Sequence, residues 1–111
     1  MKVSIKTALA RLPGLPAAGY PHGVPFTTVM AGGTMRVEVF APQGVDLQTP
    51  HAQDELYFVQ AGTGEIVING QRFDAAAGDA FFVAAHTLHR FENFSEDFLT
   101  WVVFYGPPGG E

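Results

Sequence analysis

ELYFVQAGTGEIVINGQRF, residues 55–73, is the stretch of the chain that decides its fold class. Its first six residues are rich in aromatic and branched side chains, which is typical of a β-strand, and glycines close that strand. Two shorter runs of strand-forming residues follow, separated by Asn69-Gly70, a dipeptide strongly preferred in two-residue hairpin turns. This stretch therefore predicts three consecutive β-strands, the last two joined as a hairpin.

The same two-residue period continues on both sides of this stretch. In 34–40, Met35, Val37 and Val39 alternate with charged residues, which predicts a half-buried strand. The run FLTWVVFY at 98–105 is almost wholly apolar and predicts a strand buried on both faces. Aromatic residues along these strands, Tyr57 among them, are expected to fill the interior. Shorter strands are expected at 80–83 and 89–91.

One helix is expected, near the N-terminus. Ser4 is a suitable N-cap, and apolar residues recur at helical spacing over 4–12, before Pro13 and Gly14 end the pattern. A loop rich in Pro and Gly follows, and the tail GPPGGE is expected to fray. The chain thus predicts one all-β domain over 1–111, with a short helix and loop over 1–26 and a barrel or sandwich over about 27–106.

Composition limits the classes of function. The chain has 111 residues, and with 47% hydrophobic and only 15% charged residues it is not expected to be disordered. The absence of cysteine excludes disulfides, thiolate metal sites and a cysteine nucleophile. A net charge of −5 argues against nucleic acid as a partner. No apolar run has the length of a membrane span, and Lys6, Arg11 and Pro13 interrupt any signal-peptide core, so a cytoplasmic location is expected.

Two histidines and a glutamate are the strongest candidates for chemistry. His51 stands four residues before Glu55, at the entry of a predicted strand, and His89 follows the strand at 80–83. Two imidazoles and one carboxylate suit a divalent ion of Fe, Mn, Ni, Zn or Cu. The alternative is an ordinary ion pair at the protein surface. Asp54 is expected to face solvent beside Glu55 or to hydrogen-bond a ligand histidine.

The spacing of these residues among glycines resembles the two sequence motifs of the cupin superfamily. The first motif is matched by Gly44-VDLQTP-His51-AQD-Glu55-LYFVQA-Gly62, with Thr49 in the place of the motif's first histidine. The second is matched by Gly78-DAFFV-AAH-TL-His89-RFE-Asn93, with Ala84 and His86 replacing the motif's proline and glycine. The resemblance implies a jelly-roll β-barrel of the small single-domain cupin type.

The resemblance also implies a metal site formed by His51, Glu55 and His89. Thr49 is the departure that matters, because a hydroxyl is a weak ligand, so either water completes the site or metal affinity is low. Gln53 lies two residues from both His51 and Glu55, so it shares their face if the segment is extended. It would then be a weak metal ligand through its carbonyl oxygen, or a hydrogen-bond partner that orients a ligand.

The function expected from this resemblance is to bind, or act on, a small polar organic molecule in the barrel mouth. Whether the chain is an enzyme stays open: a metal-dependent dioxygenase, isomerase or lyase are the choices, with His86 or Gln53 as the proton-handling group. His86 also fits as a plain loop residue. The alternative is a non-catalytic binding module, metal-free or with a structural metal. A homodimer is expected, formed through 98–105 and the N-terminal segment.

Overall fold

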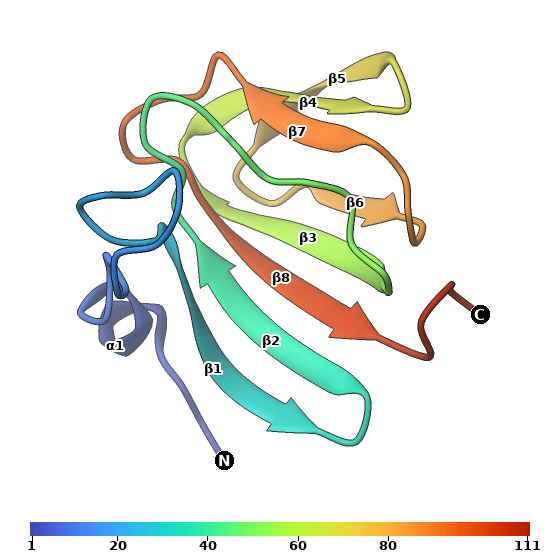
Figure 1. Cartoon of the computed structure of the whole chain (residues 1–111). Coiled ribbons are helices and arrows are strands. Elements are labelled where there is room, and N and C mark those ends of the chain that lie inside the picture. Colours follow the sequence, from blue (N-terminus) through green and yellow to red (C-terminus); the bar gives the residue numbers. More distant parts are fainter.

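Two antiparallel sheets face each other in the computed structural model, which describes all 111 residues (Figure 1). One short helix precedes eight strands, and the sequence patterns predict the helix and every strand except β1. In chain order the elements are α1 (Ile5–Leu9), β1 (Phe26–Gly32), β2 (Met35–Phe40), β3 (Asp54–Ala61), β4 (Thr63–Ile68), β5 (Gln71–Ala76), β6 (Ala80–Val83), β7 (His89–Glu92) and β8 (Leu99–Tyr105).

The larger sheet has the strand order β1-β2-β8-β3-β6 and the smaller one β5-β4-β7. The β4–β5 hairpin turns at Asn69 and Gly70, whose φ angles of 49° and 81° are those that a type I′ turn requires. The predicted hairpin is therefore confirmed. This topology places β3 and β7 in opposite sheets, so side chains from both strands meet inside the molecule.

The core lies between the sheets. Tyr57 from β3, Ile66 from β4, Phe91 from β7 and Val102 from β8 are all almost completely buried there. Burying large aliphatic and aromatic side chains stabilises such a fold by about 1.5–3 kcal/mol each. The all-β fold class and the interior role of these aromatic residues follow the sequence prediction.

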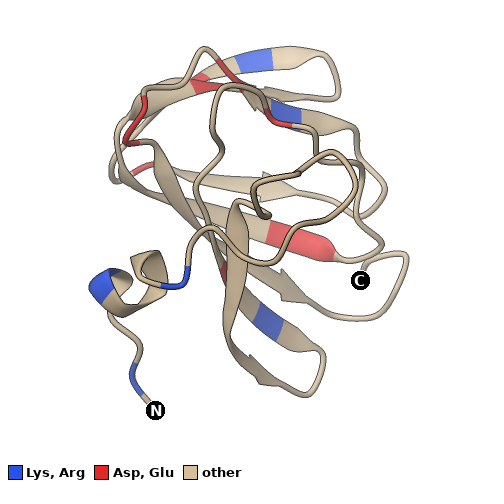
Figure 2. Cartoon of the chain, turned by 60° about the vertical axis from the view of Figure 1, so that its left-hand side comes forward, with Lys and Arg blue, Asp and Glu red and all other residues tan.

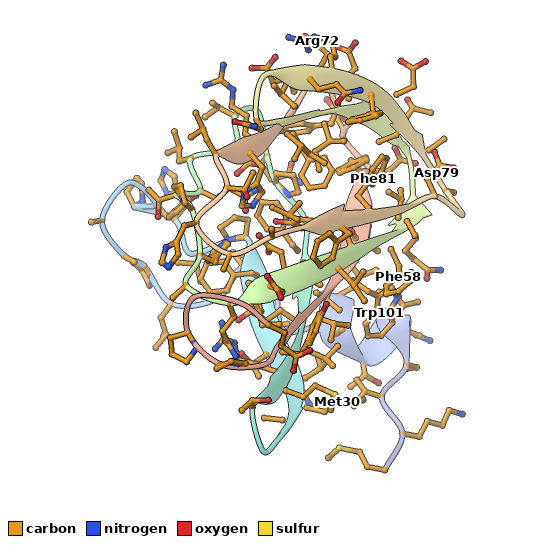
Figure 3. The ribbon with its side chains drawn as sticks, turned by 90° about the vertical axis from the view of Figure 1, so that its right-hand side faces the viewer. Met30, Phe58, Arg72, Asp79, Phe81 and Trp101 are labelled. Atoms are coloured by element: carbon orange, nitrogen blue, oxygen red, sulfur yellow. The ribbon has the colours of Figure 1, made fainter.

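β8 departs from its prediction of burial on both faces. It lies in the middle of the larger sheet, between β2 and β3. Val102 and Phe104 point inward and are buried, whereas Trp101 and Val103 on the outer face are only half-buried. The outer face remains partly open because α1 covers its β1–β2 side and no other element covers the rest (Figure 1). Its exposed aromatic side chains include Phe58, which is 43% exposed and is the cross-strand partner of Trp101 (Figure 3).

The sequence prediction places the end of the helix wrongly and misses one strand. The helix begins as predicted, with Ser4 accepting a hydrogen bond from the Thr7 amide at 3.3 Å, but it ends at Leu9 rather than residue 12. Leu12 continues the apolar spacing and packs against the same cluster as Ala8, but it lies beyond the end of the helix. β1 was not predicted because a bulge between Thr28 and Met30 interrupts its alternation.

The C-terminal tail does not fray. The Gly109 amide donates to the Ala52 carbonyl at 2.7 Å, and the Glu111 amide donates to the Asp54 carboxylate at 3.1 Å. These contacts hold the tail against the chain just before β3. The five-residue helix α1 is too short to cross a membrane, and no longer helix is present.

Candidate metal centre

The structure brings His51, Glu55 and His89 together at one end of the interior. His51 lies on the loop before β3, Glu55 is the second residue of β3, and His89 opens β7 in the opposite sheet. One ligand atom from each residue can be chosen so that all three lie within 4.8 Å of one another. Glu55 and His89 are 1% and 2% exposed, and His51 is half-buried. A surface ion pair is therefore not the right description of this cluster.

His89 is held with one ring nitrogen facing the cluster. Its Nδ1 lies 2.7 Å from the Thr87 carbonyl, which can only accept, so Nδ1 carries the proton and donates. Nε2 then points inward, 2.8 Å from Glu55 Oε1. Burial lowers the pKa of His89, but the hydrogen bond and negative charge of Glu55 outweigh it and leave the pKa raised. A fixed ring of this kind is the usual arrangement for a metal-binding histidine.

Glu55 has a buried oxygen without a partner. Its Oε2 makes no hydrogen bond and lies 4.0 Å from His51 Nε2. A buried carboxylate oxygen left unpaired is energetically costly, and a cation between Glu55 and the two imidazoles would compensate it. Burial lowers the pKa of His51 and so favours its neutral form, the form that binds metals.

Gln48 points a fourth acceptor into the cluster, and the sequence analysis did not identify it. Its Oε1 lies 3.1 Å from His89 Nε2 and 3.4 Å from His51 Nε2. Motif spacing had directed attention to Thr49, which lines the neighbouring cavity but is exposed. Thr49 and Pro50 lie in a segment that is not a strand, so strand alternation does not fix the direction of the Thr49 side chain. No signal in the sequence distinguishes Gln48 from its neighbours.

Asp46 fixes the direction of the Gln48 amide. Asp46 is buried, and its carboxylate accepts from the Gln48 backbone amide at 3.0 Å and from Gln48 Nε2 at 2.5 Å. The same carboxylate accepts from the Phe91 amide of β7 at 2.8 Å. Because the amide nitrogen of Gln48 is turned to Asp46, its oxygen must face the histidines.

Tyr57 completes the inner wall of the site. It stands two residues after Glu55 on the same face of β3, and its hydroxyl donates to Gln48 Oε1 at 2.9 Å and lies 3.1 Å from His89 Nε2. Burial, together with the negative charges of Glu55 and Asp46, raises the pKa of Tyr57 well above its usual value. The phenol therefore stays protonated and acts as a hydrogen-bond donor.

The two residues predicted to handle protons do not line the cavity beside the cluster. Gln53 donates from Nε2 to the carbonyls of Thr34 and Gly106, at 3.0 and 2.9 Å, so it braces the β1–β2 turn against the end of β8. His86 is exposed, adopts a φ of 62° and donates its backbone amide to the His51 carbonyl at 2.7 Å. The structure gives Gln53 a structural contact and places His86 in a loop.

Asp54 is buried rather than solvent-facing, and it does not contact a histidine. Its carboxylate accepts from the amides of Ala85 and Glu111, at 2.9 and 3.1 Å. The expectation for Asp54 was therefore wrong. The bond from Ala85, with the one from His86 to His51, ties the β6–β7 loop to the segment that carries His51 and Glu55.

A cavity of about 290 Å³ opens beside the cluster. This volume lies at the small end of the range typical of ligand sites. His51, Gln48 and Tyr57 reach it from the cluster, and apolar side chains form more than half of its lining. Its remaining lining residues are Tyr20, Phe26, Arg36, Glu38, Phe40, Leu47, Thr49, Val102 and Phe104.

The residues of the cluster fit a divalent cation. Two imidazole nitrogens, a carboxylate and an amide oxygen supply uncharged and anionic ligand atoms, and the Tyr57 hydroxyl directs its proton at Gln48. This donor set suits first-row divalent metals and does not select among them. Such an ion would compensate the buried Oε2 of Glu55, which has no hydrogen-bond partner.

A profile of the Cupin domain family matches residues 36–105, and the chain belongs to that family. It is 42% identical over 62 residues to the uncharacterized protein SCO3923 of Streptomyces coelicolor, covering 56% of this chain and 59% of that one. It is also 31% identical over 86 residues to the HTH-type transcriptional activator RhaS of Yersinia pestis. That match covers 78% of this chain but only 31% of RhaS.

Among solved structures, KdgF from Halomonas sp. superposes with a TM-score of 0.63 at 23% identity. The alignment covers 71% of this chain and 74% of KdgF. At that identity the likeness shows the fold alone. The cupin fold predicted from the two motifs is thus confirmed, together with the presence of a His/Glu/His cluster in the barrel.

Proposed function

We propose that the chain binds a divalent metal ion through His51, Glu55 and His89, and uses it to bind a small polar organic molecule in the adjoining cavity. The observation that carries this proposal is the buried, unpartnered Oε2 of Glu55 beside two inward-facing imidazoles. Four acceptor atoms converging on one region repel one another unless a cation or proton lies between them.

A bound divalent ion supplies Lewis acidity that polarises a ligand carbonyl or hydroxyl oxygen. The chain's own residues supply the rest. Tyr57 donates a hydrogen bond toward acceptors at the cluster, and Gln48 orients its carbonyl oxygen there. More than half of the cavity lining is apolar, which favours binding of the ligand's carbon chain. This combination supports chemistry on a hydroxy acid or carbonyl compound, of the isomerase, lyase or dioxygenase classes.

A second candidate is a non-catalytic binding module without metal. Two observations favour it: Thr49 stands where the cupin motif has a histidine, and part of the transcriptional activator RhaS is similar to this chain. In that case a protonated His89 would pair with Glu55, at their separation of 2.8 Å, and the cluster would be a buried ion pair.

Elemental analysis of untagged protein, purified without chelators, separates these two functions. We expect close to one metal ion per chain in the parent protein, lost in His51→Ala and in His89→Ala. His22→Ala is the matched control, because His22 is an exposed histidine in the N-terminal loop and should leave metal content unchanged. The same proteins are then titrated calorimetrically with Zn²⁺ and Mn²⁺.

Metal-free protein that takes up neither ion, while remaining folded by circular dichroism, contradicts the metal proposal and supports the binding module. Metal that persists in both alanine variants contradicts the assignment of the ligands. Stoichiometric metal in the parent and in His22→Ala, but in neither His51→Ala nor His89→Ala, supports the proposed ligands. The element found then selects the reactions to assay.

A further inference from the structure

The cavity has one permanent cation in its wall. Arg36 of β2 is the only Lys or Arg among the lining residues, in a chain that has only six of them (Figure 2). It lies in one cross-strand row with the site: Arg36 pairs with Phe104 of β8, and Phe104 pairs with Glu55 of β3. Since cross-strand partners share a face, all three side chains point to the same side of the sheet.

The guanidinium of Arg36 is held in place, but only part of its hydrogen-bonding capacity is satisfied within the chain. Its Nε donates to Glu38 Oε2 at 2.9 Å, and its Cζ lies 4.5 Å from the centre of the Phe104 ring. The two terminal NH₂ groups make no hydrogen bond within the chain, and 43% of the side chain is exposed. A guanidinium fixed through Nε and stacked on an aromatic ring presents its terminal edge to a carboxylate in bidentate geometry.

The free edge of Arg36 lies a short span from the candidate metal centre. The Phe104 ring that supports the guanidinium also meets the His51 ring edge-on, at 4.9 Å between centroids. The Arg36 and Glu55 backbones are two strand spacings apart, roughly 10 Å. After allowance for the reach of both side chains, a ligand touching both ends needs a chain of about three to five carbons.

We infer that Arg36 binds the carboxylate of a small monocarboxylic acid, whose second oxygen function reaches the His51, Glu55 and His89 cluster. The second contact rests on the proposed metal function, whereas the first does not. Glu38 narrows the ligand class further. Its carboxylate already occupies one side of the guanidinium, so in a chain of net charge −5 a monoanion fits better than a phosphate dianion.

The experiment is calorimetric titration with a series of ω-hydroxy acids, 3-hydroxypropanoate, 4-hydroxybutanoate and 5-hydroxypentanoate, at constant ionic strength. 4-Hydroxybutanamide is the uncharged control ligand. Each is titrated into metal-free and Zn²⁺-loaded protein, and Zn²⁺ alone is titrated in parallel. The variants are Arg36→Gln, Arg36→Lys and Glu38→Gln. Arg72→Gln is the matched control, because Arg72 pairs with Glu65 and Glu92 on the smaller sheet.

We expect at least one acid to bind about tenfold or more tightly than the amide, since a charge-assisted bidentate contact is lost in the amide. Arg36→Gln should weaken acid binding by a similar factor, and Arg36→Lys should recover only part of it. Glu38→Gln should strengthen acid binding, because it removes a competing negative charge while keeping an acceptor for Nε. Arg72→Gln should change nothing.

Equal binding of acids and amide, no binding of any acid at millimolar concentration, or unchanged acid binding in folded Arg36→Gln overturns the inference. Glu38→Gln is expected to strengthen acid binding, and misfolding would not produce such a gain. Failure of Zn²⁺ to bind refutes the proposed metal function instead. The assignment of Arg36 is then judged on the metal-free titrations.

Discussion

Replacing Asp46 by asparagine tests whether Gln48 belongs to the metal centre. Asp46 accepts two hydrogen bonds from Gln48 and one from the Phe91 amide. Asparagine has the same shape but presents an NH₂ group in place of one oxygen. At the position of Oδ2 that group would oppose the NH₂ of Gln48 and the Phe91 amide, and at Oδ1 it would oppose the Gln48 backbone amide. Either way the hold of residue 46 on Gln48 is weakened, and the Gln48 side-chain amide becomes free to rotate. The rotation would direct an N–H group, instead of Oε1, at His51 and His89.

Asp46→Asn is expected to lower both the affinity for Zn²⁺ and the free energy of unfolding. Residues that orient metal ligands typically contribute 10–100-fold to affinity, so Asp46→Asn should raise the Kd for Zn²⁺ by about that factor. In metal-free protein, the loss of a buried carboxylate that accepts three bonds should lower the free energy of unfolding by about 1.5–3 kcal/mol. Calorimetric titration with Zn²⁺ measures the first quantity, and urea denaturation in a chelator measures the second.

Gln48→Ala and the double variant decide whether the effect passes through Gln48. If it does, Asp46→Asn should weaken Zn²⁺ binding much less when Gln48 is already alanine. Asp74→Asn removes the same charge from an exposed position on β5 and controls for net charge. An unchanged Kd in Asp46→Asn, or fully additive effects in the double variant, would refute the role given to Gln48.

Three further predictions concern the fold and its assembly. Ile66→Ala opens a cavity at a fully buried position and should lower the free energy of unfolding by about 3 kcal/mol, measured by urea denaturation. Gly62→Ala should cost about 3 kcal/mol, because the new Cβ would lie 2.7 Å from Phe98 Cα. Gly70→Ala meets no neighbour and should cost only about 1 kcal/mol for its left-handed backbone, so equal losses would contradict the steric argument. We also propose that two chains associate through the open outer face of the larger sheet. Phe58→Glu should then convert a dimer to a monomer of 11.9 kDa in sedimentation, whereas a monomeric parent would exclude the dimer.

The fold was predictable wherever a strand keeps a strict two-residue period or ends in a turn with a specific backbone requirement. Asn69 and Gly70 located the β4–β5 hairpin because few residues other than Asn and Gly adopt two successive positive φ angles. β1 escaped prediction because its bulge shifts the pattern in mid-strand. The helix was predicted too long because Leu12 continues the helical spacing and packs against the same cluster as Ala8, although it lies beyond the end of the helix.

The candidate site was predictable only as far as spacing along the chain determines it. His51, Glu55 and His89 follow motif intervals, and the structure brings their side chains together. Tyr57 had a usable signal, since it shares a strand face with Glu55. Gln48 had none, because its direction depends on the buried carboxylate of Asp46, which in turn is fixed by a contact with β7. Such tertiary contacts leave no periodic trace in sequence.

The register of the larger sheet sets how the proposed metal centre and the proposed carboxylate contact at Arg36 lie relative to each other. A slip of one residue in β8 would turn Phe104 outward and remove the ring that supports both Arg36 and His51. It would also break the row that aligns Arg36 with Glu55. The hydrophobic alternation that buries Phe104 therefore sets the spacing between the two ends of the cavity as well. Phe104→Leu keeps the core apolar but removes the ring, and should weaken 4-hydroxybutanoate binding more than it weakens Zn²⁺ binding. Equal losses in the two titrations would show that Phe104 acts on the fold as a whole and not on the position of Arg36.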